Sequence, residues 1–290
     1  MKYSTGHFSP NRCFRHAAFL LAATAMLAVV AVATASGAQA VQRRAVLVGG
    51  GPRPAEAVRA FVEWSGGARA RIVIIPWASE EQAESAEALA VELRAHGAMQ
   101  IESLVLDTPA DAATRKSVLR DATGIFMTGG DQRRLMDVID GAGLGDLLRE
   151  RYRAGCVFAG TSAGTAAMAA TMITGDGDFE VIDGSRVETR AGIGVLPAIL
   201  VDQHFIRRSR QNRLIGLVLM HPTLAGVGID EGTAALITNE RKLEVVGPGQ
   251  IVVVDARRAT RRTARTGADL RLHVLGSGMR FDLVARRVLP

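Results

Sequence analysis

The chain has 290 residues, 48% of them hydrophobic and 22% charged, which is typical of a globular protein of one or two domains. Its formal net charge of +6 would suit a nucleic-acid ligand. However, no aromatic residues alternate with the basic ones and no nucleic-acid motif is present, so we expect no nucleic-acid partner. No linker rich in Pro, Gly or Ser and no internal repeat divides the middle of the chain, and this favours a single main domain.

The first forty residues have the layout of a secretory signal peptide. They contain no acidic residue, and their basic residues are Lys2, Arg12 and Arg15. An almost unbroken apolar run over residues 17–35 follows, and Ala38-Gln39-Ala40 then provides a small-x-small cleavage site. A run of this length could also stay in a bilayer as an anchor, but the small residues favour cleavage after Ala40. We therefore predict a secreted or periplasmic protein without stable membrane association, whose single domain covers residues 41–290.

Removal of this segment changes the charge and the cysteine count. The remaining chain has 32 basic and 29 acidic residues, so its net charge falls to about +3. It keeps one cysteine, Cys156, and an exported protein with one thiol cannot form an internal disulfide. Its stability must therefore come from core packing, which its length permits.

From residue 45 onward, short apolar runs alternate with helical patterns. Strands are predicted at residues 45–48, 71–76, 101–106, 124–127 and 156–159, and helices at residues 55–64, 80–96 and 111–121. This alternation predicts an α/β fold with a mostly parallel central sheet and helices on both faces. Functional sites in such sheets lie beyond the carboxyl ends of the strands, so the glycine-rich segments after the first, fourth and fifth strands should meet at one edge.

The second half of the chain is less regular and richer in strand patterns. Short strands are predicted at residues 236–238, 242–246, 251–254, 270–275 and 280–284. We therefore expect a β-rich C-terminal part that belongs to the same domain.

The segment Gly160-Thr161-Ser162-Ala163-Gly164 contains the candidate nucleophile. It follows a predicted strand and precedes a helix-like run over residues 165–172. A serine at such a strand-to-helix turn projects from the backbone, and the flanking glycines remove the Cβ atoms that would clash. The free N–H groups at a helix start can stabilise the oxyanion that forms when a carbonyl is attacked. Ser162 is therefore predicted to be the nucleophile of a serine peptidase.

A serine nucleophile needs a base and a carboxylate that orients it. After residue 40 the histidines are His96, His204, His221 and His273. His204 is the favoured base, because it lies between an apolar segment and an arginine-rich helical pattern. Glu231 is the candidate acid, since it stands among small residues after a short apolar segment. Asp202 is a rival acid two positions before His204, and Ser162 with Asp255 and His273 is a second possible set.

No pattern in the chain indicates a metal or a cofactor. There is no H-E-x-x-H motif, no pair of cysteines and no Walker A sequence. Gly49-Gly50-Gly51-Pro52 lacks the spacing of a dinucleotide-binding loop. We therefore predict that the protein works without a metal or a cofactor.

Four segments, in this order, resemble the cyanophycinases. They are Phe126-Met127-Thr128-Gly129-Gly130-Asp131-Gln132, Gly160 to Gly164, Asp202-Gln203-His204-Phe205 followed by Arg208, Arg210 and Arg213, and Gly228-Ile229-Asp230-Glu231. That family belongs with the dipeptidase E group of serine peptidases, and the resemblance implies a fold like that of class I glutamine amidotransferases. One departure is Thr165, where alanine is common in the family; this position should face the helix and not the chemistry.

The resemblance implies roles for individual residues. The catalytic triad would be Ser162, His204 and Glu231, and the backbone N–H groups of Gly130 and Ala163 would form the oxyanion hole. The residues implied to line the substrate pocket are Gln132, Asp202, Gln203, Arg208, Arg210 and Arg213. Guanidinium groups suit this role, because they bind a carboxylate through two hydrogen bonds, and a β-linked aspartate leaves its α-carboxylate free.

The implied substrate is cyanophycin, a poly-aspartate with arginine on each side-chain carboxyl, which the family cleaves to β-Asp-Arg dipeptides through an acyl-enzyme. Another β-aspartyl peptide remains an open alternative. So does an aspartyl or isoaspartyl dipeptidase of the dipeptidase E type, or a non-catalytic binding protein of the same fold. Whether the protein forms a homodimer is also left open by the sequence.

Overall fold

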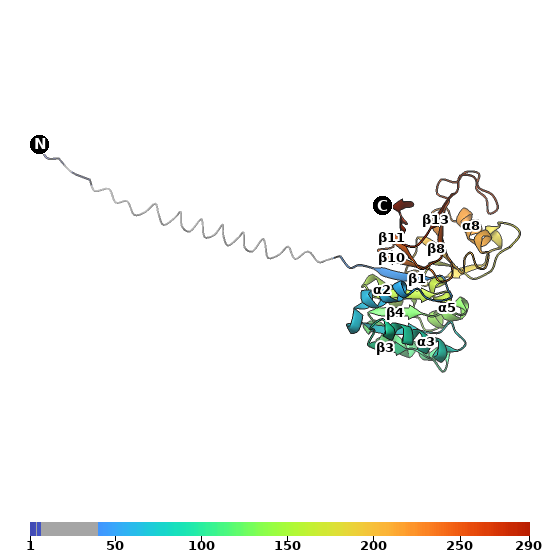
Figure 1. Ribbon diagram of the computed structural model, residues 1–290. Coiled ribbons are helices and arrows are strands. Elements are labelled where there is room, and N and C mark those ends of the chain that lie inside the picture. Colours follow the sequence, from blue (N-terminus) through green and yellow to red (C-terminus); the bar gives the residue numbers. More distant parts are fainter. Residues whose placement is uncertain (4, 7–39) are drawn as a thin grey trace. The chain divides into compact units, whose positions relative to one another are not determined.

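A nine-stranded mixed sheet is the framework of residues 41–290, which form one compact unit (Figure 1). The computed structural model describes residues 1–3, 5–6 and 40–290. In spatial order the strands are β15 (Arg287–Leu289), β14 (Arg280–Asp282), β11 (Lys242–Val246), β10 (Ala234–Thr238), β1 (Arg44–Val48), β5 (Val157–Thr161), β4 (Gly124–Met127), β2 (Arg71–Ile75) and β3 (Gln100–Ser103). β1 to β5 are parallel, and the four C-terminal strands extend the sheet in antiparallel fashion from β1.

Alternate residues of the parallel strands pack against helices on opposite faces of the sheet. In β1, Ala45 and Leu47 belong to one buried cluster, and Val46 and Val48 belong to another. Successive side chains of a strand point to opposite faces, so a strand that is apolar throughout must be covered on both. One face is covered by α2 (Ala55–Ser65) and α3 (Gln82–Ala95), and the other by α4 (Lys116–Asp121), α5 (Gln132–Gly141) and α6 (Gly145–Arg153).

A second sheet of four strands ends next to His204. Its order is β13 (Arg271–Leu275), β12 (Ile251–Asp255), β9 (Ala225–Ile229) and β8 (Ile199–Gln203), and β8 runs parallel to β9. Helix α8 (Gln211–Met220) covers one face of this sheet, where Leu214 and Val218 share a buried cluster with Leu200 and Val254. The remaining elements are α7 (Ala163–Ala166), the two-stranded sheet of β6 (Thr171–Ile173) and β7 (Thr189–Ala191), and the 3₁₀ turns η1 (Gly67–Arg69), η2 (Pro109–Arg115) and η3 (Gly184–Arg186).

The predicted α/β class is confirmed, with a mostly parallel central sheet, helices on both faces and a β-rich C-terminal part. Several predicted boundaries are wrong. The helix expected over residues 111–121 begins as η2 and continues as α4, and the strand expected over residues 101–106 ends at residue 103. The helix-like run over residues 165–172 contains only the end of α7 and then enters β6. The C-terminal strands divide between two sheets, because β12 pairs with β9 and β13 pairs with β12.

The predicted signal peptide lies outside the described residues except at its ends, so its cleavage stays a prediction. Among the residues that the structure does describe, no helix is both long and apolar enough to cross a bilayer.

Candidate active site

Three consecutive carbonyl groups at the end of β1 connect the segments that carry the predicted catalytic residues. Each accepts one backbone N–H, at distances of 3.1, 2.7 and 2.9 Å: Val48 from Ser162, Gly49 from His204, and Gly50 from Gly232. These hydrogen bonds bring together the carboxyl ends of β1, β5, β8 and β9. The serine, the histidine and the glutamate therefore follow three different strands, and the backbone of all three segments is hydrogen-bonded to residues 48–50.

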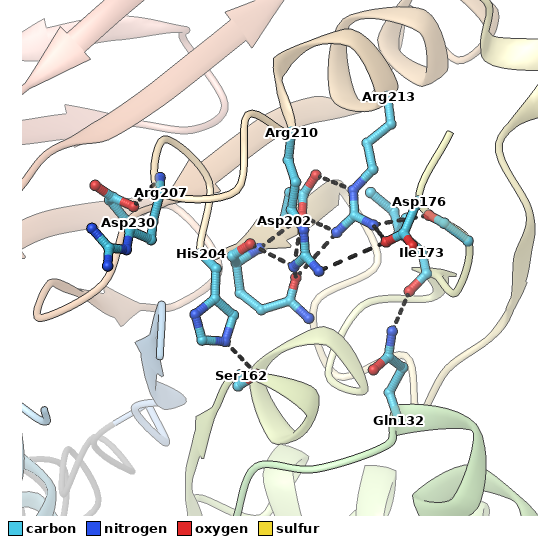
Figure 2. A network of polar contacts seen from close by, with 12 residues as sticks. Gln132, Ser162, Ile173, Asp176, Asp202, His204, Arg207, Arg210, Arg213 and Asp230 are labelled. Atoms are coloured by element: carbon cyan, nitrogen blue, oxygen red, sulfur yellow. Dashed lines mark hydrogen bonds and ion pairs between the residues drawn. The ribbon is translucent and has the colours of Figure 1, made fainter. Parts of the chain in front are cut away.

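The side chains of these three residues form one hydrogen-bonded row. The Ser162 Oγ lies 2.8 Å from the Nε2 of His204, and Figure 2 shows the two side chains pointing toward each other. The Nδ1 of the same imidazole lies 2.6 Å from the Oε1 of Glu231. These distances are within the range in which a base can take the hydroxyl proton and a carboxylate can orient the base.

The backbone at Ser162 and at His204 adopts a conformation that non-glycine residues rarely take. Their φ angles are 51° and 49°. A left-handed residue of this kind costs about 1–3 kcal/mol, and such strain concentrates at functional sites. At Ser162 it directs the side chain out of the turn between β5 and α7, as the sequence pattern predicts.

The glycines around the serine are required by close backbone contacts. A Cβ on Gly160 would lie 2.4 Å from the carbonyl carbon of Gly164, and a Cβ on Gly164 would lie 2.2 Å from the carbonyl oxygen of Met127. Both distances are far below ordinary contact. The turn therefore packs directly on β4, and this contact determines where Ser162 points.

The environment of His204 favours a neutral imidazole. Burial lowers its pKa below the usual value, and the hydrogen bond and negative charge of Glu231 oppose that effect. The positive charges of Arg208 and Arg210 lower the pKa further. A neutral imidazole whose Nδ1–H donates a hydrogen bond to Glu231 has a free lone pair on Nε2, which is what a general base for Ser162 needs.

Two backbone N–H groups next to Ser162 are free to bind an oxyanion. Ala163 is the first residue of α7, and Gly130 follows β4 in the left-handed region with a φ of 135°. A Cβ on Gly129 would lie 3.4 Å from that of Ser162, so this backbone passes beside the serine. Within residues 40–290, neither N–H donates a hydrogen bond to a protein acceptor. This arrangement fits the oxyanion hole that the sequence predicts, and that role stays a prediction.

Two of the residues predicted to bind substrate are instead engaged with each other. Asp202 is fully buried and Arg213 is 2% exposed, and the Arg213 Nε donates to the Asp202 carboxylate at 2.7 Å. A second bond joins the Nη2 to the other carboxylate oxygen. Asp202 therefore neutralises Arg213 and makes no hydrogen bond to the His204 ring, and the structure places it outside the row that the rival triad required.

Of the remaining predicted pocket residues, Gln203 is buried, and Gln132 and Arg210 are partly exposed. The Nη1 of Arg210 donates to the carbonyl and the side-chain oxygen of Gln203, at 2.8 and 2.9 Å. Arg208 is exposed, and its backbone N–H donates to the carbonyl of His204. The side-chain amide of Gln132 donates to the carbonyl of Ile173 at 3.1 Å (Figure 2). Arg208 and Arg210 lie close enough to His204 for their charges to act on it, and within residues 40–290 the Arg208 side chain makes no hydrogen bond or ion pair.

The second alternative set is not brought together. Asp255 binds Arg257, and the ring of His273 packs against Phe281 with the ring centres 4.9 Å apart. Both residues lie on strands of the four-stranded sheet, away from the hydrogen-bonded row at Ser162. Within residues 40–290 no group of three or more His, Cys, Asp or Glu side chains is arranged to hold a metal ion.

Sequence reasoning missed two residues that support the row. A Cβ on Gly50 would lie 2.2 Å from the His204 ring, so the imidazole occupies the space above this glycine. The buried Thr165 Oγ1 lies 2.7 Å from the carbonyl oxygens of both Val48 and Gly160. The run of three glycines after β1 was the available signal for the first; a threonine in a short helix gives no comparable signal.

Comparison with known proteins identifies the chain. The model of the family "Peptidase family S51" matches residues 45–245. A cyanophycinase from Nostoc sp. (strain PCC 7120) is 38% identical over 263 residues, which cover 86% of this chain and 88% of the relative. A cyanophycinase from Geminocystis herdmanii is 33% identical over 255 residues, which cover 83% of this chain and 94% of the relative. The crystal structure of a peptidase from an acI-B1 actinobacterium superposes with a TM-score of 0.63 at 22% identity, covering 84% of this chain and 98% of that one, and supports the fold.

The fold, the site and these matches define a serine peptidase. The chain belongs to peptidase family S51, and within it the chain is cyanophycinase-like.

Proposed function

We propose that the protein hydrolyses cyanophycin to β-Asp-Arg dipeptides, with Ser162 as the nucleophile, His204 as the general base and Glu231 as the carboxylate that orients the imidazole. The observation that supports this chemistry most directly is the row of contacts at 2.8 Å and 2.6 Å. The substrate is supported by the names of the relatives, which match this chain over most of its length.

In the proposed mechanism, the Ser162 hydroxyl attacks the carbonyl carbon of a backbone aspartyl residue while its proton moves to the Nε2 of His204. The N–H groups of Gly130 and Ala163 stabilise the negative charge that develops on the carbonyl oxygen. His204 then donates the proton to the nitrogen of the leaving amine, and an ester remains on Ser162. A water molecule that gives its proton to His204 hydrolyses this ester and restores the serine.

The arginines suit the charge of the substrate. In cyanophycin each arginine is attached through its amino group, so its own carboxylate remains free. Arg208 is exposed, and the Arg210 side chain is 10% exposed, so both can present part of a guanidinium to that carboxylate. Arg213 has a different proposed role. It is paired with Asp202 and contacts the Gln203 side chain, and these contacts hold the residues that pack behind Arg210 in place.

Incubation of the enzyme with purified cyanophycin, followed by mass spectrometry of the soluble products, tests the substrate. We expect β-Asp-Arg as the product, and Ser162→Ala should release none above background. Intact cyanophycin together with rapid hydrolysis of isoaspartyl dipeptides would contradict the proposal and assign the dipeptidase activity instead.

We also propose that the protein is exported and cleaved after Ala40. The basic start, the apolar run and the small residues of the first forty positions support this, and the compact unit of the structure begins at Val41. N-terminal sequencing of protein recovered outside the cytoplasm should begin at Val41. Recovery of active protein that retains Met1 would contradict the cleavage.

A further inference from the structure

We propose that Asp176 determines the preference of this site for a substrate with a cationic side chain. The inference rests on the proposed function and adds to it a residue that no sequence motif indicates. Cyanophycin carries a guanidinium as well as a carboxylate on every unit. A pocket that contained only arginines would attract the carboxylate and repel the guanidinium, so selectivity for arginine requires an accessible negative charge.

Arg210 and Arg213 together form what we call the arginine wall, and Asp176 lies at its edge. Its Oδ1 is 3.6 Å from the Nη1 of Arg213 and 4.0 Å from the Nη2 of Arg210, and Figure 2 shows it beside Arg213. Arg210 in turn binds Gln203, the residue before His204. A chain of direct contacts therefore leads from Asp176 to the neighbour of the proposed base.

The segment around Asp176 is held in place by contacts of its backbone. The Arg213 Nη1 donates to the carbonyl of Gly175 at 2.8 Å. A Cβ on Gly177 would lie 2.8 Å from that of Arg213, so the glycine allows the chain to pass close to this arginine. Gln132 binds the carbonyl of Ile173 at 3.1 Å on the other side. These contacts hold the backbone on both sides of Asp176, and they bring its carboxylate beside Arg213.

Asp176 has an accessible carboxylate, whereas the other acidic side chains nearest to the proposed base are already bound. Asp202 is buried against Arg213, Glu231 binds His204, and Asp230 accepts the backbone N–H of Arg207 at 3.0 Å. The Asp176 side chain is 75% exposed, and its ion pairs with Arg213 and Arg210 are long, at 3.6 and 4.0 Å. Within residues 40–290 its carboxylate accepts no hydrogen bond. Its oxygens can therefore accept the N–H groups of an incoming guanidinium.

The test compares a short cyanophycin oligomer with one in which citrulline replaces arginine. Citrulline keeps the shape of the side chain and replaces the guanidinium with a neutral urea group. We expect Asp176→Asn to lower kcat/KM for the arginine oligomer by about tenfold, mostly through KM, because one charge-assisted hydrogen bond to the substrate is lost. The value for the citrulline oligomer should change less than about twofold. Asp176→Glu retains the carboxylate and should keep the preference for arginine.

Glu180→Gln is the matched control, because Glu180 is another exposed carboxylate of the same loop that lies outside the arginine wall. It should leave the ratio of the two kcat/KM values unchanged. If Asp176→Asn lowers both values equally, or changes neither, Asp176 does not select the cation and the inference is wrong while the proposed function stands. If the wild-type enzyme cleaves neither oligomer, the proposed function is wrong and the inference is wrong with it.

Discussion

Gly50 has no room for a side chain, because the imidazole of His204 occupies the space where a Cβ would lie. That Cβ would be 2.2 Å from the Cε1 of His204 and 2.5 Å from its Nε2, whereas ordinary contacts begin near 3.4 Å. In Gly50→Ala the ring must therefore move by about 1 Å. A displacement of about 1 Å in a catalytic group can lower the rate about 10²-fold, so we expect kcat/KM to fall by about that factor.

The matched control is Gly97→Ala. Gly97 has a φ of +91°, close to the +109° of Gly50, but a Cβ there meets no atom within 4 Å. Both variants therefore carry the backbone cost of a side chain in this region, and only Gly50→Ala displaces the imidazole. The assay is kcat/KM with a β-Asp-Arg oligomer, together with a thermal unfolding curve for each variant. A folded Gly50→Ala enzyme within about threefold of the wild type would refute the role of the ring position.

Three further predictions follow from the same contacts. Because burial and the charge of Arg208 lower the pKa of His204, its neutral form should persist to lower pH than that of an ordinary histidine. Arg208→Gln removes a positive charge, so the acid limb of the pH profile for inactivation by a small serine-directed inhibitor should move to higher pH. A shift to lower pH would contradict this. Asp202→Asn leaves Arg213 without its buried anion, because its other acidic neighbour, Asp176, is exposed, and should lower the free energy of unfolding in urea by about 3–5 kcal/mol. A change under about 1 kcal/mol would mean that the pair is not buried. Thr165→Val removes the hydroxyl that lies 2.7 Å from two carbonyl oxygens, and it should cost about 1–3 kcal/mol of stability and lower kcat more than KM. Thr165→Ser retains the hydroxyl and should keep the stability and the kcat of the wild type. If Thr165→Val equals the wild type in both quantities, the hydroxyl has no role.

The central sheet and the nucleophile could be predicted because their signals are local. The parallel strands are buried on both faces, so they appear in the sequence as short apolar runs between helical patterns. The elbow at Ser162 combines two glycines with a strand before it and a helix after it, and each of these features is within ten residues of the serine.

Strand β9 could not be predicted, because its composition is determined by contacts with distant residues. It contains Gly226 and Gly228, which are unfavourable for a strand by local preference. A Cβ on Gly228 would lie 2.4 Å from the ring of Phe205, and one on Gly226 would lie 2.6 Å from Val218. The packing of α8 and of the segment after His204 therefore requires glycine where a strand pattern would show a larger residue.

The choice between Glu231 and Asp202 also depended on the fold. Asp202 lies two residues before His204 and Glu231 lies 27 residues after it, so spacing alone does not decide between them. The sequence also does not show that Asp202 is paired with Arg213, eleven residues later. Three backbone carbonyls, those of Val48, Gly49 and Gly50, place the three catalytic side chains. Every residue has a backbone carbonyl, so the amino-acid sequence gives no sign of this role.

The most direct test of the central claim is covalent labelling of Ser162. The enzyme is treated with a small serine-directed phosphonate, digested and examined by peptide mass spectrometry, with Ser162→Ala as the control. The proposed mechanism predicts a single adduct on the peptide that contains Ser162, loss of peptidase activity in proportion to labelling, and no adduct in Ser162→Ala. An active enzyme that is labelled elsewhere, or a Ser162→Ala variant that retains near wild-type turnover, would contradict the assignment of Ser162 as the nucleophile.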